Sequence, residues 1–319
     1  MLSKTLAAIG SFFLRNSSVL YLLIVGILAW IFVPRFGTLS NLTLILRQSA
    51  VPAIACAAMA FILVTCKVDL STGYIVGLVS SVCGVMLINW SLNPYLAILL
   101  CLLLGAAIGA FNGALTAYVK VPAFISTLGS GLIVFGLAQI VGGNKAVNNL
   151  PKEFLAFGST TIFGFPLMVY YAVLVVAVLH FVMHKTTFGR QLQSMGLNAS
   201  ACYMAGVRNE SIEMVTFILS GVLSAFCSVL MTIRVNCSQP DMGGGTFSFE
   251  AVTAAVIGGT SLIGGKVNII GCALGAIIIK IIENCINLLN INYYMYQAVL
   301  GAVILVALIV ESLKSKSKN

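Results

Sequence analysis

Long apolar runs separated by short polar stretches recur along the whole chain. A helix needs about 20 mostly apolar residues to cross a bilayer, and about ten runs approach that length. We expect spanning helices over residues 18–34, 50–66, 72–89, 95–118, 123–141, 167–184, 212–233, 250–264, 268–289 and 295–311. The pattern therefore predicts an all-α membrane protein whose spans form one polytopic bundle.

The polar stretches between these runs are short. The longest cover residues 142–166, 185–211 and 234–249, and none is long enough to build a hydrophobic core of its own. We therefore expect a single transmembrane domain over residues 1–319. The first run ends at Pro34 without a small-residue cleavage site, so we interpret it as a retained helix and not as a signal peptide.

Composition and charge agree with a membrane protein. Only 8% of the residues are charged and the mean hydropathy is +1.08, whereas a soluble domain keeps abundant charge on its surface. With both termini in the cytoplasm, the basic residues inside are Lys4, Arg15, Lys67, Lys120, Lys185, Arg190, Arg208, Lys266, Lys314, Lys316 and Lys318. Those outside are Arg35, Arg47, Lys145, Lys152 and Arg234. This excess predicts that orientation, and the net charge of +9 does not indicate nucleic-acid binding.

The chain carries no recognisable catalytic or metal motif. Nine scattered cysteines lack the spacing of a metal site, and His180 and His184 share a helix face without a third ligand nearby. The stretch 258–266 superficially resembles a phosphate loop, but Thr260 and Val267 break the pattern. We therefore expect a non-enzymatic protein that binds no metal and no nucleotide.

Four ionisable residues fall in apolar sequence, namely Asp69, Glu250, Lys280 and Glu283. Lys280 and Glu283 share a helix face, which favours a structural ion pair over a transported-ion site. Asp69 is expected to cap a helix that begins near Ser71 or Thr72. An ion-coupled carrier usually needs a buried carboxylate chain, and none is present, so the energy for uphill transport must come from elsewhere.

Glycines at four-residue spacing predict close helix packing at Gly73 and Gly77, at Gly105, Gly109 and Gly113, and at Gly271 and Gly275. Residues 66–78 and 258–275 each mix polar residues and glycines into membrane-depth sequence. Such interruptions in two halves of a transporter point to a permeation site. An internal repeat and a chance similarity are both open for this pair.

The polar stretch 185–213 contains a modest apolar face. At helical spacing, the face comprises Met195, Ala199, Cys202, Tyr203 and Gly206. A short helix of this kind, flanked by Arg190 and Arg208, fits a groove on a partner protein. The alternative is an amphipathic helix that lies on the membrane surface.

Four blocks together carry a resemblance to a known family. They are VPRFGTLSNLTLILRQSAVPAIACAAMAFILVTCKVDLSTG (33–73), VPAFISTLGSGLIVFGLA (121–138), TTFGRQLQSMGLNASACYMAGV (186–207) and FEAVTAAVIGGTSLIGGKVNIIGCALGAIII (249–279). In this order they resemble the membrane permease subunit of bacterial ABC importers for ribose and related monosaccharides.

The resemblance implies the ABC importer permease fold in the bacterial inner membrane, with a second permease copy or paralogue. It also implies an ABC ATPase subunit that binds ATP and Mg, and an extracytoplasmic substrate-binding protein. The loop at about 185–211 would then be the coupling segment seated on the ATPase. Its contact residues would be Gly189, Met195, Gly196, Asn198, Ala199, Ala201, Cys202 and Gly206. Cys202 departs from the Ala or Arg common in relatives, and Lys67 precedes Val68 and Asp69 where Gly-Ile-Asp is common.

A neutral sugar needs only hydrogen bonds along its path. Candidate path residues in apolar context are Asn112, Ser126, Thr127, Thr260 and Ser261, although hydrogen bonds between helices account for each equally well. The Gly-rich stretch 234–250 would be a gate or a binding-protein contact, and a flexible linker is the competing interpretation. Its candidate residues are Gln239, Pro240, Gly243, Gly244 and Gly245.

The expected function is therefore a permease subunit that forms the path for a monosaccharide, with ATP hydrolysis on a separate chain. A nucleoside or an autoinducer-type furanose is the alternative cargo. An ion-coupled secondary carrier is the less favoured alternative.

Overall fold

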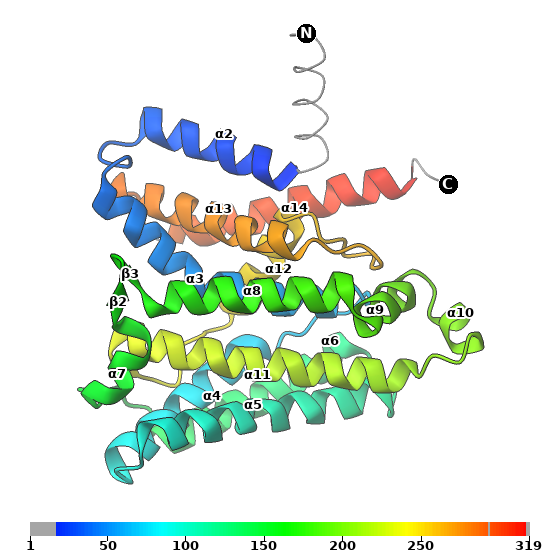
Figure 1. Ribbon diagram of the computed structural model, residues 1–319, viewed down its shortest axis with the longest axis horizontal. Coiled ribbons are helices and arrows are strands. Elements are labelled where there is room, and N and C mark those ends of the chain that lie inside the picture. The colour runs from blue at the N-terminus through cyan, green and yellow to red at the C-terminus, as the bar shows by residue number, and fades with distance from the viewer. Residues whose placement is uncertain (1–16, 293, 317–319) are drawn as a thin grey trace.

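A computed structural model describes residues 17–292 and 294–316 as an array of long helices (Figure 1). The helices are α2 (Ser17–Phe32), α3 (Leu39–Leu63), α4 (Thr72–Gly84) continued by a π-helix (Val85–Asn89), α5 (Pro94–Ala117), α6 (Ala123–Gly142), α7 (Lys152–Ser159), α8 (Leu167–Lys185), α9 (Thr187–Leu197), α10 (Ala199–Met204), α11 (Asn209–Val235), α12 (Thr246–Ile257), α13 (Ile269–Leu288) and α14 (Tyr294–Lys316). Two tiny antiparallel sheets pair β1 (Val147–Asn148) with β4 (Cys237–Ser238) and β2 (Thr161–Ile162) with β3 (Phe165–Pro166).

The long helices run between two distinct ends of the bundle. Helices α9 and α10 lie at one end, and α7 with β2 and β3 lies at the other (Figure 1); we call these the α9–α10 end and the α7 end. Among the described residues, seven helices are long and apolar enough to cross a membrane, and α2 and α12 are shorter apolar helices. The predicted polytopic all-α bundle is thus confirmed, and each predicted run overlaps one long or apolar helix of the bundle.

Helix α3 is the central helix, and its start corrects a predicted boundary. It begins at Leu39 and not near residue 50, because residues 39–49 include polar side chains that lower the local hydropathy although they belong to the helix. Asn41 and Asn284 of α13 exchange two side-chain hydrogen bonds of 3.0 and 2.8 Å. Arg47, predicted to lie in an outer loop, is therefore part of α3.

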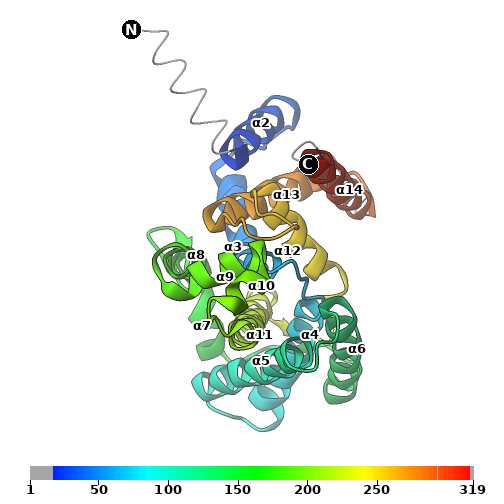
Figure 2. The same cartoon turned by 90° about the vertical axis from the view of Figure 1, so that its right-hand side faces the viewer.

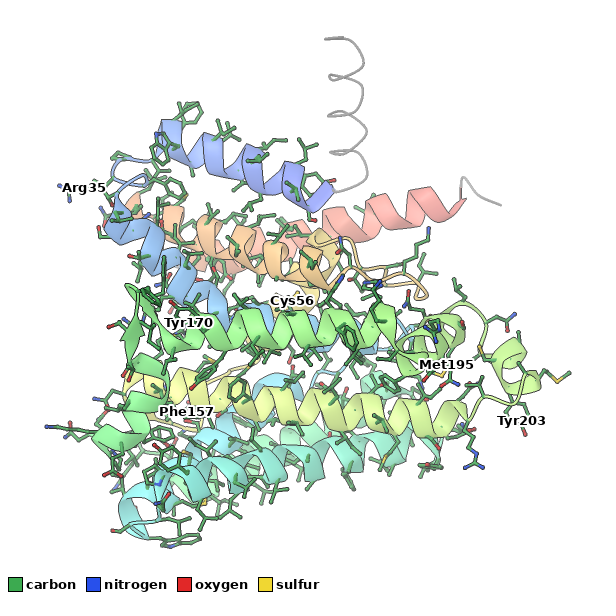
Figure 3. All side chains as sticks on the ribbon, in the orientation of Figure 1. Arg35, Cys56, Phe157, Tyr170, Met195 and Tyr203 are labelled. Carbon is green, nitrogen blue, oxygen red and sulfur yellow. The ribbon has the colours of Figure 1, made fainter. Side chains whose placement is uncertain are left out.

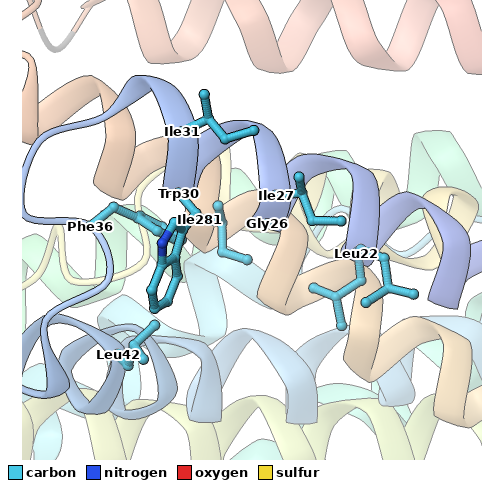
Figure 4. Close-up of a pocket in the computed structure, with 9 residues that line it drawn as sticks. Leu22, Gly26, Ile27, Trp30, Ile31, Phe36, Leu42 and Ile281 are labelled. Carbon is cyan, nitrogen blue, oxygen red and sulfur yellow. The ribbon is translucent and has the colours of Figure 1, made fainter.

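Helix α2 packs at the edge of the bundle. Ala29, Val33 and Phe36 form a small buried cluster with Ile45 of α3 and Ile281 of α13. Beside this cluster, an apolar groove of about 420 Å³ lies between α2, α13 and α3, with Trp30 and Phe36 at one side (Figure 4). The outer face of α2 is exposed and apolar, as expected for a helix that faces lipid.

The predicted glycine contacts are confirmed where α5 crosses α11. A Cβ at Gly105 would overlap the carbonyl oxygen of Gly221, and a Cβ at Gly221 would overlap the carbonyl oxygen of Gly105. Gly109 likewise lies against the backbone of Phe217. This close approach makes the α5–α11 pair one of the tightest helix contacts of the bundle.

We expect Gly221→Ala to lower the stability of the purified protein by about 1–3 kcal/mol, because the added methyl group overpacks a backbone contact. The measurement is thermal unfolding in detergent. Gly26→Ala is the matched control, since no atom lies within 4 Å of a Cβ at Gly26. Equal unfolding temperatures for the two variants would contradict the packing account.

Candidate translocation and coupling site

Two non-helical segments enter the interior of the bundle. Residues 64–71 follow α3 and lead to the start of α4, while residues 236–245 follow α11 and lead to the start of α12. Asp69 in the first segment contacts Ser220, which lies about 16 Å along α11 from its first residue. Both short helices therefore begin deep in the bundle, where backbone polar groups need partners within the protein.

Buried side-chain oxygens hold the first segment in place. Asp69 Oδ1 accepts hydrogen bonds from the backbone N–H (3.0 Å) and the hydroxyl (2.6 Å) of Ser71, and Oδ2 accepts one from the hydroxyl of Ser220 (2.8 Å). Asn112 of α5 donates to the Ser71 hydroxyl at 2.9 Å. The predicted N-capping role of Asp69 needs correction: Ser71 is the N-cap residue of α4, the helix has no side-chain cap hydrogen bond, and the Asp69 carboxylate instead binds Ser71 in the turn that precedes the helix.

The starts of α4 and α12 meet at Ser248. The Ser248 hydroxyl lies 2.7 Å from that of Thr72, accepts from the N–H of Gly73 at 3.1 Å, and contacts the carbonyl of Leu70 at 3.1 Å. From this point α4 runs toward the α7 end, where Gly84 packs on Ser238. Helix α12 runs the other way and ends beside Gly271 of α13. Two helix N-termini, each with its positive dipole end, thus converge inside the bundle.

The five predicted path residues fall into two groups. Asn112 and Thr127 belong to the buried network, since the Thr127 hydroxyl accepts from the N–H of Leu70 at 3.1 Å. Ser126, on the same helix as Thr127, donates to the carbonyl of Ala123. Thr260 and Ser261 lie apart, in the loop between α12 and α13. The side-chain amide oxygen of Asn112 is buried without a hydrogen-bond partner among the described residues.

The Gly-rich stretch packs against α4. A Cβ at Gly77 would overlap the carbonyl oxygen of Pro240, and a Cβ at Gly243 would overlap the carbonyl oxygen of Gly73. Pro240 is buried, Gln239, Gly243 and Gly244 are half-buried and Gly245 is exposed. The structure thus places most of this stretch within the bundle, and its spatial partner is residues 66–78. The segment compared with 66–78 from sequence, 258–275, instead spans the α12–α13 loop and the start of α13.

At the α9–α10 end, the structure corrects the predicted single helix. Asn198 has φ −157° and ψ 96°, which ends α9, and its side chain accepts from the N–H of Ala201 at 2.9 Å to start α10. Met195 and Cys202 are buried, whereas Ala199, Tyr203 and Gly206 are exposed, so the five residues do not share one face. The spacing rule failed because it assumed an unbroken helix.

Gly196 connects this end to the rest of the bundle. A Cβ there would overlap the carbonyl oxygen of Val64, at the end of α3, and that carbonyl also accepts from the N–H of Gly265 at 2.9 Å. The Cys66 thiol donates to the carbonyl of Ile263 at 2.7 Å, and burial raises the pKa of this thiol. Gly189 closes the turn from α8 against the Met183 carbonyl. Helix α9 is therefore in direct contact with the start of residues 64–71 and with the loop between α12 and α13.

Exposed apolar side chains form the tip of this end. Leu197, Tyr203 and Met204 are exposed, Met204 to 87%, and Tyr203 projects outward in Figure 3. Leu197 and Met204 lie outside the apolar face that helical spacing predicted. The signal that could have found them is Asn198 followed by Ala-Ser-Ala, because Asn is a preferred N-cap and marks a new helix start. We call Leu197, Tyr203 and Met204 the tip residues.

Ion pairs link segments at several points. Lys67 pairs with Glu213, and Lys120 pairs with Glu210 at 3.0 Å. The predicted pair of Lys280 with Glu283 is confirmed at 2.8 Å, and Glu250 of α12 adds a second carboxylate 2.5 Å from the same ammonium group. The rings of His180 and His184 lie with centroids 4.5 Å apart, and the described residues contain no group of three metal-ligating side chains.

The spanning helices and the interrupted segments in the interior define a multi-pass membrane protein of the transport class. The profile of the family described as "Branched-chain amino acid transport system / permease component" matches residues 41–308, and the chain belongs to this permease family. The ribose import permease RbsC of Haemophilus influenzae is 30% identical over 95% of both chains, and RbsC of Escherichia coli K12 is 32% identical over 94% of both. The D-allose permease AlsC of the same strain is 31% identical over 88% of this chain and 86% of its own. No solved structure gives a significant match.

Family membership settles several expectations. The chain is a permease component, a transport subunit and not a catalytic one, as its sequence predicted. The resemblance to the permeases of ABC sugar importers is likewise confirmed, because full-length relatives at about 30% identity carry that role. The roles of the individual site residues remain predictions.

Ser220→Ala should destabilise the protein by about 1.5–3 kcal/mol, because it removes a hydrogen bond to a buried carboxylate. Thermal unfolding in detergent measures the effect. Ser224→Ala is the matched control: it is a buried serine one turn further along α11 that makes no hydrogen bond in the part of the chain described. An equal loss in both variants would show that Ser220 contributes only packing.

Proposed function

We propose that this chain is the permease subunit of an ATP-driven importer for a monosaccharide, delivered by an extracytoplasmic binding protein. The observation that carries the proposal is the meeting of two oppositely directed short helices, α4 and α12, inside the bundle at Ser248. Interrupted helices whose N-termini point at the membrane midplane are typical of solute sites in transporters. The full-length relatives whose names specify ribose, allose and autoinducer 2 support a sugar-like cargo.

The motor would be a separate ATPase subunit that binds ATP and Mg. The tip residues support this, because large apolar side chains at a polar membrane edge suit insertion into a groove on a partner. In this proposal ATP binding displaces α9 and α10, and Gly196 transmits the displacement to the end of α3 and to residues 64–71 and 258–268. Alternating access then follows from rigid-body rocking of the bundle.

The α9–α10 end would face the cytoplasm. Arg190 lies in α9, Arg208 and Lys266 lie in connections at this end, and Lys67 and Lys120 pair there with the first turns of α11. In Figure 1 the start of α2 and the end of α14 also lie toward it, which would place both ends of the described chain inside. The excess of basic residues at this end agrees with the positive-inside rule.

The path would form between two permease copies. Helices α6 and α14 flank α4 and α12 on one side of the bundle, seen from the α9–α10 end in Figure 2. The exposed side chains of α6 are apolar, among them Phe124, Leu132 and Ile133, and a Cβ at Gly129 or Gly136 would meet no other atom. A second copy packed here would enclose the starts of α4 and α12. Ser126, Thr127 and Asn112 would then support the wall of the path.

Met204→Asp should abolish ATP-driven sugar uptake and copurification of the ATPase, because it puts a charge into an apolar contact. Uptake of labelled ribose, a nucleoside and a furanosyl signal is measured in vesicles that contain the copurified complex, with and without ATP. Phe163→Asp is the matched control, since Phe163 is 93% exposed at the opposite end.

The coupling proposal predicts normal uptake and normal ATPase recovery for the Phe163 variant. Uptake that persists without ATP and collapses with an ion gradient would instead support a secondary carrier. Uptake of the nucleoside or furanosyl signal alone would keep the permease role and change the cargo.

Gly243→Ala should reduce uptake strongly while the ATPase still copurifies, because the methyl group displaces residues 239–245 from Gly73 of α4. Gly245→Ala should leave uptake unchanged, since the nearest atom to a Cβ there is 3.8 Å away. The assay is ATP-driven uptake by the same vesicles. If both variants transport normally, the segment is a flexible linker and not a gate.

A further inference from the structure

A polar pocket of about 310 Å³ lies between α3, α11 and α13, in the half of the bundle toward the α7 end. Its lining comprises Leu44, Arg47, Gln48, Arg234, Val235, Lys280 and Glu283. Arg234 is in the last turn of α11, and its guanidinium donates to the carbonyl of Gln48 at 3.4 Å. The pocket is therefore built by three helices that are distant in sequence.

The charges in and beside this pocket do not balance. Lys280 is engaged by Glu250 at 2.5 Å and by Glu283 at 2.8 Å, and these three groups together carry one negative charge. Arg47 and Arg234 add two positive charges. No other carboxylate among the described residues lines the pocket, so the cluster retains one uncompensated positive charge.

One donor in the cluster also lacks a partner. The Nε–H of Arg47 is buried and makes no hydrogen bond within the described residues. An unpaired charge at membrane depth is costly, and an unsatisfied buried donor adds to that cost. A bound anion would remove both penalties at once.

We propose that this pocket binds one phosphate group, from a phospholipid headgroup or from free phosphate. Guanidinium groups match the geometry of phosphate oxygens, and two of them line one cavity here. A single anion neutralises the remaining charge. Through Arg47, Arg234 and Lys280 it links α3, α11 and α13, and the Lys280–Glu250 pair extends the link to α12. The site is independent of the sugar path and of the ATPase contact.

The test uses the purified full-length chain, delipidated in detergent, at constant ionic strength. Inorganic phosphate should raise the unfolding temperature saturably, because a ligand that binds only the folded state stabilises it, whereas chloride should not. In a second arm, the protein in phosphatidylglycerol nanodiscs is extracted and its retained lipid is measured by native mass spectrometry. If phosphate raises the unfolding temperature but no lipid is retained, free phosphate is the ligand. If lipid is retained, the ligand is the phosphate of a lipid headgroup.

Arg47→Gln should weaken phosphate binding about tenfold or more, because one charge-assisted contact is lost. Gln48→Glu supplies a carboxylate within the pocket, so it should keep or raise the basal unfolding temperature and abolish the response. Arg35→Gln is the control, because Arg35 is an exposed arginine in the α2–α3 connection, outside this pocket.

Three results would overturn the proposal. The first is the absence of both a phosphate response and retained lipid in the wild-type chain. The second is an equal response to chloride, which would show general screening. The third is a phosphate-induced rise in unfolding temperature that survives in Gln48→Glu. In this variant every side-chain cation of the cluster is retained but the added carboxylate removes the excess positive charge, so phosphate should no longer bind.

Discussion

The requirement that every backbone polar group be satisfied within the bilayer governs this structure. Most of the chain meets it with unbroken helices, but residues 64–71 and 236–245 do not. In residues 64–71, polar groups are satisfied by a few short side chains, above all Asp69, Ser71 and Ser248, supported by Asn112, Thr127 and Ser220. In residues 236–245, the N–H of Gln239 donates to the hydroxyl of Ser80. Because serine, threonine and asparagine are short, they reach the neighbouring backbone without opening a gap. The network thus allows two helices to begin inside the bundle, which is the feature that a solute site needs.

The interruption at residues 64–71 also connects the interior of the bundle to the α9–α10 end through direct packing contacts. Residues 64–71 start at the end of α3, where Gly196 and Gly265 both pack on the Val64 carbonyl. Glycine is required at position 196 because a Cβ would overlap that oxygen, and a Cβ at position 265 would overlap the side chain of Leu197. Close-packed backbone contacts have little compliance, so a shift of α9 is passed on and not absorbed. Lys67 and Glu213 tie the same segment to the first turns of α11. Helix α9 and the buried network are therefore joined by one continuous set of contacts.

Hydropathy alone found nearly all of the fold, because lipid-facing helices such as α5 and α8 must present apolar side chains on most sides. It misplaced the start of α3, since Asn41, Ser49 and Arg47 are polar side chains that their neighbours in the bundle accommodate. Helix periodicity missed the break at Asn198, which depends on a single side-chain cap. The sequence singled out Asp69 as a helix cap and Asn112 and Thr127 as candidate path residues, but it could not predict that their side chains belong to one hydrogen-bond network. Their proximity follows from the re-entry of residues 64–71, which no local pattern encodes. The packing of residues 239–245 on α4 could not be predicted either, because no local sequence pattern encodes it.

The distribution of charge explains why a motor subunit is the more economical source of energy for transport. A proton- or sodium-coupled carrier needs a carboxylate that can exchange its partner during the cycle. Among the described residues, both oxygens of Asp69 bind hydroxyl or N–H donors, Glu213 and Glu210 pair with lysines, and Glu250 and Glu283 share Lys280. Each of these carboxylates has a fixed structural partner, and releasing one would leave a charge unpaired in a low-dielectric interior. The uncompensated charge at Arg47 and Arg234 has the opposite sign and cannot bind a cation. Among the described residues, the carboxylates of the interior thus hold structural partners, which favours an energy source outside this chain over an ion gradient.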